Sequence, residues 1–148
     1  MRRPPAYQEY PSDLLANEHY KLMDLDERGL FHTLRHYCWV NESIPANESS
    51  LAELLNLTES YLDKTFSHRV RSFFCKHDAD PTRLISPELV DYKRGLIEKS
   101  LRRAESGKLG GLRSAETRVK DQAILQSAAQ AKVEESTAEL QRKKASRG

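Results

Sequence analysis

The sequence predicts a mainly α-helical protein with one small β-hairpin and a basic C-terminal tail. Three observations lead to this prediction. Apolar residues recur at helical intervals in several stretches between residues 25 and 105. Two short apolar stretches joined by a polar, turn-prone connection lie between those helical stretches. The last third of the chain is rich in Ala, Glu, Gln, Lys and Arg, and it holds few large apolar residues.

Length and composition favour one small soluble domain with an extension. The 148 residues contain no apolar run near the roughly 18 to 20 residues that a membrane span needs. The two N-terminal arginines are not followed by an apolar core, so we expect no signal peptide and a cytoplasmic location. Cys38 and Cys75 are too few for a disulfide framework, and we expect both to be reduced, buried thiols.

Residues 1–24 are predicted to be an arm that ends in a short helix. Three prolines among the first eleven residues resist helix formation. The stretch from Ser12 to Lys21 has short helical character, with Leu14, Leu15 and Tyr20 as candidate core contacts.

The clearest predicted helix runs from about Leu25 to Val40. Asp24 and Glu27 have the spacing of a capping box, in which each residue satisfies a backbone N–H of the other. The predicted apolar side holds Leu30, Leu34, Tyr37 and Cys38, with Phe31 at its margin. The other sides hold Arg28, His32, Arg35 and His36. We expect Asn41–Pro45 to form a loop, because Pro45 has no backbone N–H to donate.

Two further helices follow with a tight turn between them. Ser50 and Glu53 have a second capping-box spacing, and they open a short helix whose three leucines should face inward. Thr58 can cap a helix over about residues 59–73. Its inward side would hold Leu62, Phe66, Val70 and Phe73. Its outward side, which we expect to be basic and polar, would hold Ser60, Lys64, Ser67 and Arg71. This order is that of a helix-turn-helix, whose second helix enters the DNA major groove.

A predicted β-hairpin after the second helix extends this pattern. Residues 73–76 and 83–86 can form two short strands. A hairpin in this position is the wing of a winged helix, so we predict a winged-helix-like domain over residues 25–105. Lys76 and Arg83 would then contact backbone phosphates. The alternative is a plain helical bundle with an irregular loop.

The next predicted helix starts at Ser86, with Pro87 in its first turn. Its apolar stripe would hold Leu89, Tyr92, Leu96, Ile97 and Leu101. We expect it to end before Gly107, since three glycines within residues 107–111 weaken helix formation. This glycine segment lacks the GK[ST] ending of a P-loop, so it is expected to be a hinge or a flexible contact with phosphates.

Residues 106–148 are therefore predicted to be a hinge and a flexible or loosely helical basic tail. The large apolar residues considered there are too sparse and irregular for a sustained heptad repeat: Val119, Ile124, Leu125, Val133 and Leu140.

Charge is distributed unevenly along the chain. Residues 1–100 contain 13 Lys and Arg against 16 Asp and Glu, whereas residues 101–148 contain 11 against 6. The window 93–120 alone holds nine basic and three acidic residues. Such a local positive field favours a polyanion such as DNA, although a solvated tail would have the same composition. The residues expected to extend the DNA contact here are Arg102, Arg103, Lys108 and Arg113.

Metal and catalytic sites have little support. His32 and His36 share a helix face, but Cys38 points away from it, and Cys75 and His77 lack a second pair at zinc-finger spacing. The acidic residues near His77 are better explained by turn chemistry. We therefore expect no cofactor, no metal and no enzymatic activity.

Several separated pieces of this sequence resemble the YdaU-like proteins, a phage and prophage family of unknown function. The residues that carry the resemblance are Tyr10, Pro11, Asp13, Asp24, Glu27, Gly29, Leu30, Leu34, Tyr37, Trp39, Pro45, Gly110, Gly111, Ser114 and Ala115. The resemblance covers about residues 7–118. It implies a winged-helix-like domain in phage replication within a bacterial host cell, similar to the N-terminal domains of phage replisome organisers.

The chain departs from the phage replisome organisers, which start replication, in two ways. Its first hundred residues are net acidic, and it lacks a long helicase-contacting domain. A DNA-binding accessory factor in replication initiation, with DNA and a replication or other protein as partners, fits better than a complete initiator. Two alternatives use the same scaffold. One is a winged-helix transcription regulator, and the other is a protein-interaction adaptor whose acidic 1–60 region meets a partner.

Overall fold

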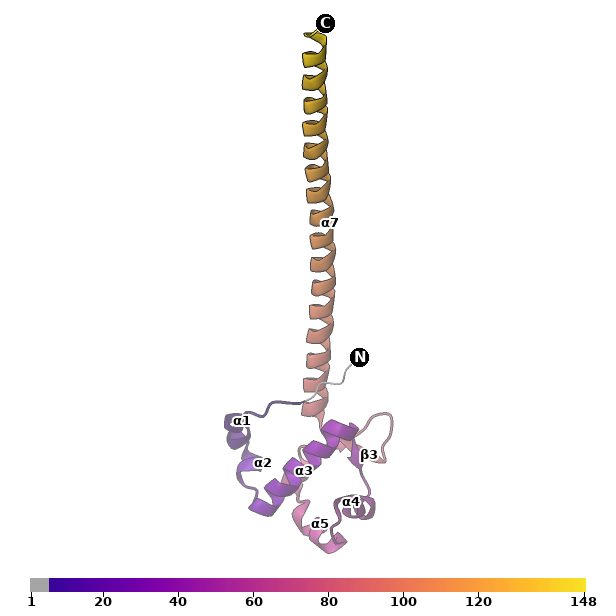
Figure 1. Ribbon diagram of the computed structural model, residues 1–148. Coiled ribbons are helices and arrows are strands. Elements are labelled where there is room, and N and C mark those ends of the chain that lie inside the picture. The colour runs from indigo at the N-terminus through magenta and orange to yellow at the C-terminus, as the bar shows by residue number, and fades with distance from the viewer. Residues whose placement is uncertain (1–5) are drawn as a thin grey trace. The chain divides into compact units, whose positions relative to one another are not determined.

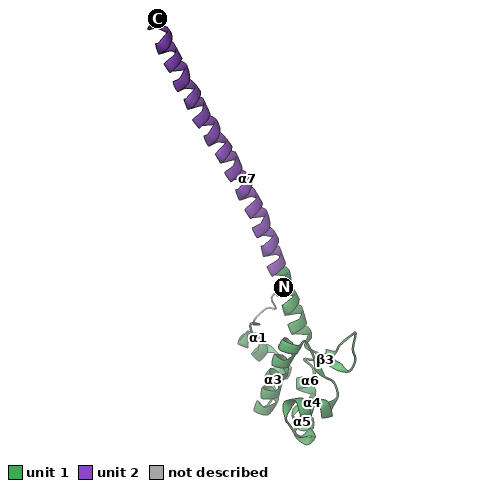
Figure 2. Ribbon diagram, turned by 45° about the vertical axis from the view of Figure 1, so that its right-hand side comes forward, with its two compact units in different colours: residues 1–99 green, residues 100–148 purple. Residues whose placement is uncertain are grey.

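The computed structural model describes residues 6–148, and most of them are helical (Figure 1). The helices are α1 (Pro11–Ala16), α2 (Glu18–Lys21), α3 (Leu25–Asn41), α4 (Glu48–Leu55), α5 (Glu59–Thr65), α6 (His68–Arg71) and α7 (Pro87–Ala145). The strands are β1 (Ile44–Pro45), β2 (Cys75–Lys76) and β3 (Arg83–Ile85). The chain divides into two compact units, residues 1–99 and 100–148 (Figure 2). The predicted class, mainly α with a small β-hairpin, is confirmed.

The three strands form one antiparallel sheet in the order β1-β3-β2. The predicted hairpin is confirmed, with Cys75 opposite Ile85 and Lys76 opposite Leu84. The predicted loop over Asn41–Pro45 is wrong at its end, because Ile44 and Pro45 form strand β1. This strand is short enough for Pro45 to fit at the sheet edge, where a missing backbone donor costs little. The resulting order is helix, strand, three short helices and hairpin. It is that of a winged helix in which α5 and α6 take the place of the second helix of the helix-turn-helix.

Helix α3 is the element on which most of the first unit packs. Its predicted capping box is present in both directions, with 2.8 Å from the Asp24 amide to Glu27 and 2.8 Å from the Glu27 amide to Asp24. Phe31, expected at the margin of the apolar side, is fully buried. Arg35, expected on a solvated side, is only 2% exposed. These two residues widen the buried face of α3 beyond the stripe that local periodicity predicts.

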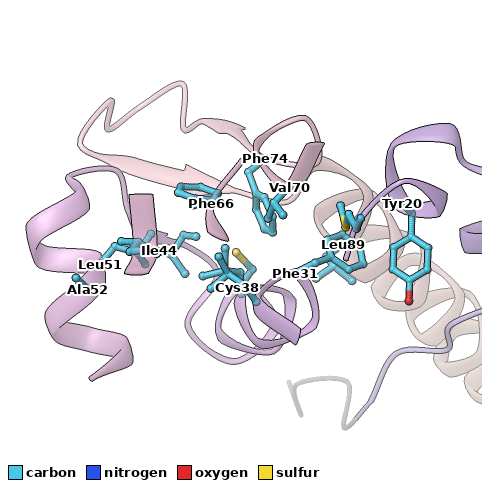
Figure 3. Packing of buried hydrophobic residues seen from close by; sticks show 14 residues of the cluster. Tyr20, Phe31, Cys38, Ile44, Leu51, Ala52, Phe66, Val70, Phe74 and Leu89 are labelled. Atoms are coloured by element: carbon cyan, nitrogen blue, oxygen red, sulfur yellow. The ribbon is translucent and has the colours of Figure 1, made fainter. Parts of the chain in front are cut away.

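The core of the first unit draws side chains from nearly every element (Figure 3). Ile44 from β1, Leu51 from α4 and Leu62 from α5 are fully buried, and Leu89 from α7 is 4% exposed. The predicted inward positions Leu15 and Leu54 are wrong, because these side chains are 54% and 41% exposed. The core members are Tyr20, Met23, Leu30, Phe31, Leu34, Cys38, Ile44, Leu51, Ala52, Leu62, Phe66, Val70, Phe74 and Leu89.

Helix α4 begins earlier than its predicted capping box. Asn47 is the N-cap, and its side chain accepts a hydrogen bond from the Ser50 amide at 3.0 Å. Asn and Ser cap helices about equally well, so either residue satisfies the local rule. The extra turn places Leu51 and Ala52 in the core.

Helix α7 continues through the glycine segment, so the predicted break before Gly107 and the predicted hinge are wrong. Gly107, Gly110 and Gly111 lie in the helix with no positive φ, and an added Cβ at each would meet only open space. A helical glycine costs only about 1 kcal/mol relative to alanine, which flanking helix formers such as Leu109 and Leu112 can offset.

The two thiols differ in exposure, and they should differ in reactivity. Burial raises the pKa of the Cys38 thiol to about 11. The predicted burial of Cys75 is wrong, because Cys75 is exposed on the edge strand β2. Since the thiolate is the nucleophile, iodoacetamide at pH 8 should modify one thiol per folded chain and two after denaturation. Mass spectrometry would read this out, and Cys75→Ser should abolish the modification of the folded chain. Rapid modification of Cys38 in the folded chain would contradict the assignment.

Candidate nucleic-acid interface

The helix-turn-helix begins as predicted at the α4–α5 turn. Asn56 ends α4 in the left-handed conformation with φ 54°, and the Leu57 amide donates to the Ala52 carbonyl at 2.9 Å. Thr58 then caps α5 by accepting a hydrogen bond from the Tyr61 amide at 3.2 Å. The two helices are therefore joined by a tight, fully defined turn.

The expected recognition helix over residues 59–73 is interrupted, so that prediction is wrong. Helix α5 ends at Thr65, Phe66 adopts φ −81° and ψ 59°, and α6 starts at His68. The Phe66 carbonyl has no helical partner, and it accepts a hydrogen bond from Arg71 Nε at 2.8 Å instead. This side-chain bond satisfies the carbonyl that the break leaves free.

Ser60 and Lys64 are the predicted groove-reading residues that lie together on one exposed side of α5. Their neighbours Glu59 and Asp63 are also exposed. The exposed surface of α5 is therefore of mixed charge and not basic as expected. A carboxylate beside a phosphate is repelled, which limits what α5 can contribute to DNA binding.

Ser67 and Arg71 do not extend that surface. Ser67 precedes α6, and its buried Oγ has no hydrogen-bond partner within residues 6–148. Arg71 lies over the Phe66 ring at 4.1 Å and also pairs with Glu48. Arg71 therefore stabilises the break between α5 and α6.

The two predicted wing residues have different surroundings. Lys76 on β2 is exposed and available to a phosphate. Arg83 on β3 donates from Nε to Ser43 Oγ and from its terminal nitrogen to the Ser43 carbonyl, both at 3.0 Å. These bonds tie β3 to the segment entering β1.

The four predicted residues of the tail, Arg102, Arg103, Lys108 and Arg113, all lie on the exposed surface of α7. Continuation of the helix places Arg102, Arg113 and Lys120 on one side, because their spacings of 11 and 7 residues are close to whole turns. The residues between them on that side are small, namely Ser106, Gly110 and Thr117. We call these six residues the basic row. Lys120 was missed by the sequence-based site prediction because a hinge was expected.

The two units carry opposite charge. Residues 6–99 contain 11 Lys and Arg against 16 Asp and Glu, a formal charge of −5, whereas residues 100–148 contain 11 against 6, a formal charge of +5. Several cations of the first unit are also paired within it: Arg35 with Glu9 and Glu88, Arg69 with Glu27, Arg71 with Glu48, and Lys93 with Glu42. The positive potential available to a polyanion is therefore concentrated in the second unit.

An apolar cavity of about 350 Å³ lies between the end of α3, strand β3 and the first turns of α7. Trp39, Ile85 and Leu89 are among its apolar lining residues. At its rim, Lys93 Nζ donates to the Trp39 carbonyl at 3.0 Å and lies 3.7 Å from Glu42. This cation is already paired, so the cavity offers mainly apolar surface.

The histidines and loop carboxylates take part in local contacts. His32 Nε2 is 3.0 Å from the Tyr20 hydroxyl, and Asp80 accepts hydrogen bonds from both the amide and the hydroxyl of Thr82, which lower its pKa. Among residues 6–148, no three His, Cys, Asp or Glu side chains are grouped to hold a metal ion. In the same part of the chain, no helix has the length and apolar character to cross a membrane.

The fold and these charges define a class: a winged-helix-like unit followed by a long helix with a basic row. Comparison with protein-family models, curated proteins and solved structures found no match. The resemblance to YdaU-like proteins thus rests on the residues named above and stays a prediction.

Proposed function

We propose that this chain is a non-enzymatic DNA-binding accessory protein whose main DNA contact is the basic row of α7. The observation that carries the proposal is the exposed positive charge of residues 102–120, the part of α7 that contains the basic row. Residues 102–120 contain six Lys and Arg against two Glu, and all are exposed. Ser106, Gly110 and Thr117 between the cations allow a phosphate backbone to come close to the helix. Lys64 and Lys76 provide weaker contacts from the winged-helix-like unit.

The test is fluorescence anisotropy of the full chain on labelled duplex and single-stranded DNA across a salt series. Replacing Arg102, Arg113 and Lys120 by Gln should weaken binding by about 10- to 100-fold and reduce the salt slope by about 2 to 3. The reason is that each cation neutralises a phosphate and releases a counterion.

The matched control removes three other cations of the same helix, Lys132, Arg142 and Lys143, by substitution with Gln. It has the same net charge as the first variant, so it separates the basic row from overall charge. We expect less than about a threefold change in affinity for the control. Equal losses in the two variants would show that net charge alone binds DNA, and no binding by the wild-type chain at low salt would exclude the proposal.

A second function is supported by the acidic character of the first unit. A surface with a formal charge of −5 is repelled by DNA but suits a basic protein partner. We propose that the winged-helix-like unit docks such a partner while α7 holds DNA. This division fits an adaptor in phage replication initiation, the setting that the resemblance to YdaU-like proteins implies. A transcription regulator would need the winged-helix-like unit itself to read bases, so Lys64→Gln should then abolish sequence preference.

A further inference from the structure

We propose that the chain forms a homodimer through a parallel two-stranded coiled coil of residues 112–140. Within this part of α7, nine positions alternate at spacings of three and four residues. We call them the neutral stripe: Leu112, Ala115, Val119, Gln122, Gln126, Ala129, Val133, Ser136 and Leu140. This is the spacing of a and d positions in a coiled coil. It goes beyond DNA binding, because it concerns a second copy of the chain.

The neutral stripe is distinguished by its lack of charged residues as well as by its apolar residues. The large apolar residues alone are sparse, which is why the sequence was expected to lack a heptad repeat. None of the nine positions is charged, however, while nine charged residues lie elsewhere in the same segment. The stripe ends at Lys108 on one side and Lys143 on the other, the next d positions in each direction. It spans about 42 Å of helix, or four heptads.

The side chains of the stripe are exposed within the single chain. Leu112, Val119, Val133 and Leu140 are 55%, 65%, 65% and 61% exposed. Apolar residues spaced along one side of a helix gain free energy only when a second surface covers them.

The seven-residue period of the neutral stripe indicates what kind of surface covers it. A repeat of seven residues drifts around a straight helix and stays on one side only when two helices supercoil around each other. The covering surface must therefore be another helix with the same repeat, and a second copy of this chain supplies it. The β-branched Val119 and Val133 lie at a positions, and the d positions hold small or polar side chains: Ala115, Gln122, Ala129 and Ser136. The polar Gln126 at an a position lowers the stability of the pair.

One pair of charges beside the stripe fits the parallel orientation. In a parallel coiled coil, the residue before an a position faces the residue five positions later in the second copy. Glu139 would face Lys144 of the second copy, an attractive pair, and no other such pair in this segment joins two charges. Two antiparallel registers are open to the stripe. The register that pairs residues 112 and 136 would place Arg118 near Lys132 of the second copy, which is repulsive, whereas the register that pairs residues 115 and 140 would place Arg118 near Glu139.

The neutral stripe and the basic row lie on different sides of α7. Their mean directions differ by about 175° at the helical angle of 100° per residue. Both surfaces can therefore be used together. In a parallel dimer the two basic rows lie at the same end of the coiled coil and face outward, away from the interface.

The proposal is tested without DNA by sedimentation equilibrium of the full chain over about 1 to 200 µM. We expect a concentration-dependent rise from 17.0 kDa toward twice that mass. Val119→Glu/Val133→Glu should weaken the dimer at least about 100-fold, because four charges would be buried at the interface. Glu forms helices better than Val, so the loss cannot come from helix propensity.

The control Ala131→Glu/Ala138→Glu adds the same charge on the side away from the neutral stripe and should leave the dimer intact. Gln126→Leu should strengthen it. A wild-type chain that stays monomeric throughout, or a dimer insensitive to Val119→Glu/Val133→Glu, would overturn the proposal.

Orientation is tested by oxidative cross-linking of Leu140→Cys in a Cys75→Ser background. The parallel register brings the two introduced thiols together, whereas antiparallel pairing separates them, so a dimer that does not cross-link would refute this orientation.

Salt gives one more test, which rests on the proposed DNA contact. Salt should weaken DNA binding and leave the dimer nearly unchanged, because the basic rows face away from the interface. If the dimer forms but DNA does not bind, the proposed function fails and the dimer stands. If DNA binds to a strictly monomeric chain, the dimer fails and the function stands.

Discussion

Replacing Glu9 and Glu88 together by Ala is expected to lower the free energy of unfolding of the first unit by about 3 to 5 kcal/mol. The two carboxylates pair with Arg35 at 3.1 Å and 3.0 Å, and the Arg35 side chain is 2% exposed. Their removal would leave a buried guanidinium without a counter-charge, which costs more than the loss of the hydrogen bonds alone. Urea denaturation followed by Trp39 fluorescence would measure the change.

Substitution of Arg35 itself should cost less. Arg35→Met removes the charge and keeps an apolar side chain against the Tyr7 and Phe31 rings, which lie 5.5 Å and 5.2 Å from the guanidinium carbon. The remaining carboxylates are 27% and 66% exposed, so water can solvate them. We expect a loss of about 1 to 3 kcal/mol.

The matched control is an exposed ion pair of the same unit. Asp91 lies 3.3 Å from Arg94, and the two side chains are 72% and 66% exposed. Asp91→Ala should change the free energy of unfolding by less than about 0.5 kcal/mol. A loss for Arg35→Met larger than that for the double Glu variant would show that Arg35 acts mainly through packing.

Elements that depend on local signals could be predicted from the sequence. Helix α3 has a capping box at its start and apolar residues on one side, and both signals lie within 17 residues. The hairpin could be predicted for the same reason, since its two strands are close in sequence and joined by turn-forming residues. Local rules also gave Thr58 as the cap of α5.

The features that were missed depend on partners far along the chain. Arg35 is buried because Glu9 and Glu88 meet it from 26 and 53 positions away. Strand β1 exists because Ile44 pairs with Leu84. The break after α5 is different, because the side-chain hydrogen bond that stabilises it joins Arg71 to Phe66, only five positions away. Helical periodicity contains no information about such contacts.

The candidate site was predictable in part. The excess of basic residues after residue 93 is visible in composition, and Arg102 and Arg113 were named from it. Their alignment with Lys120 could not be seen while Gly107, Gly110 and Gly111 were expected to interrupt the helix. In the first unit, charge alone could not show that Arg71 and Arg83 bond to neighbouring carbonyls.

Phe31→Ala is expected to lower the free energy of unfolding of the first unit by about 3 to 5 kcal/mol. Phe31 is fully buried, and its ring lies 4.7 Å from that of Phe73 and 5.4 Å from that of Tyr20. Alanine would leave a cavity among these rings, whereas Phe31→Leu should cost about 1.5 kcal/mol because it retains most of the volume. Similar losses for the two variants would show that the site collapses around the smaller side chain.

The same variant can separate the two units in function. Trp39 and all the tyrosines and phenylalanines lie in residues 1–99, so aromatic fluorescence reports the first unit alone. DNA affinity would be measured at a temperature at which Phe31→Ala is unfolded by this signal and the wild type is folded. Affinity within about twofold of wild type is expected if the basic row carries the contact, because charges on an exposed helix need no core beneath them. A loss comparable to that of the Arg102, Arg113 and Lys120 variant would assign an equal share of DNA binding to the winged-helix-like unit.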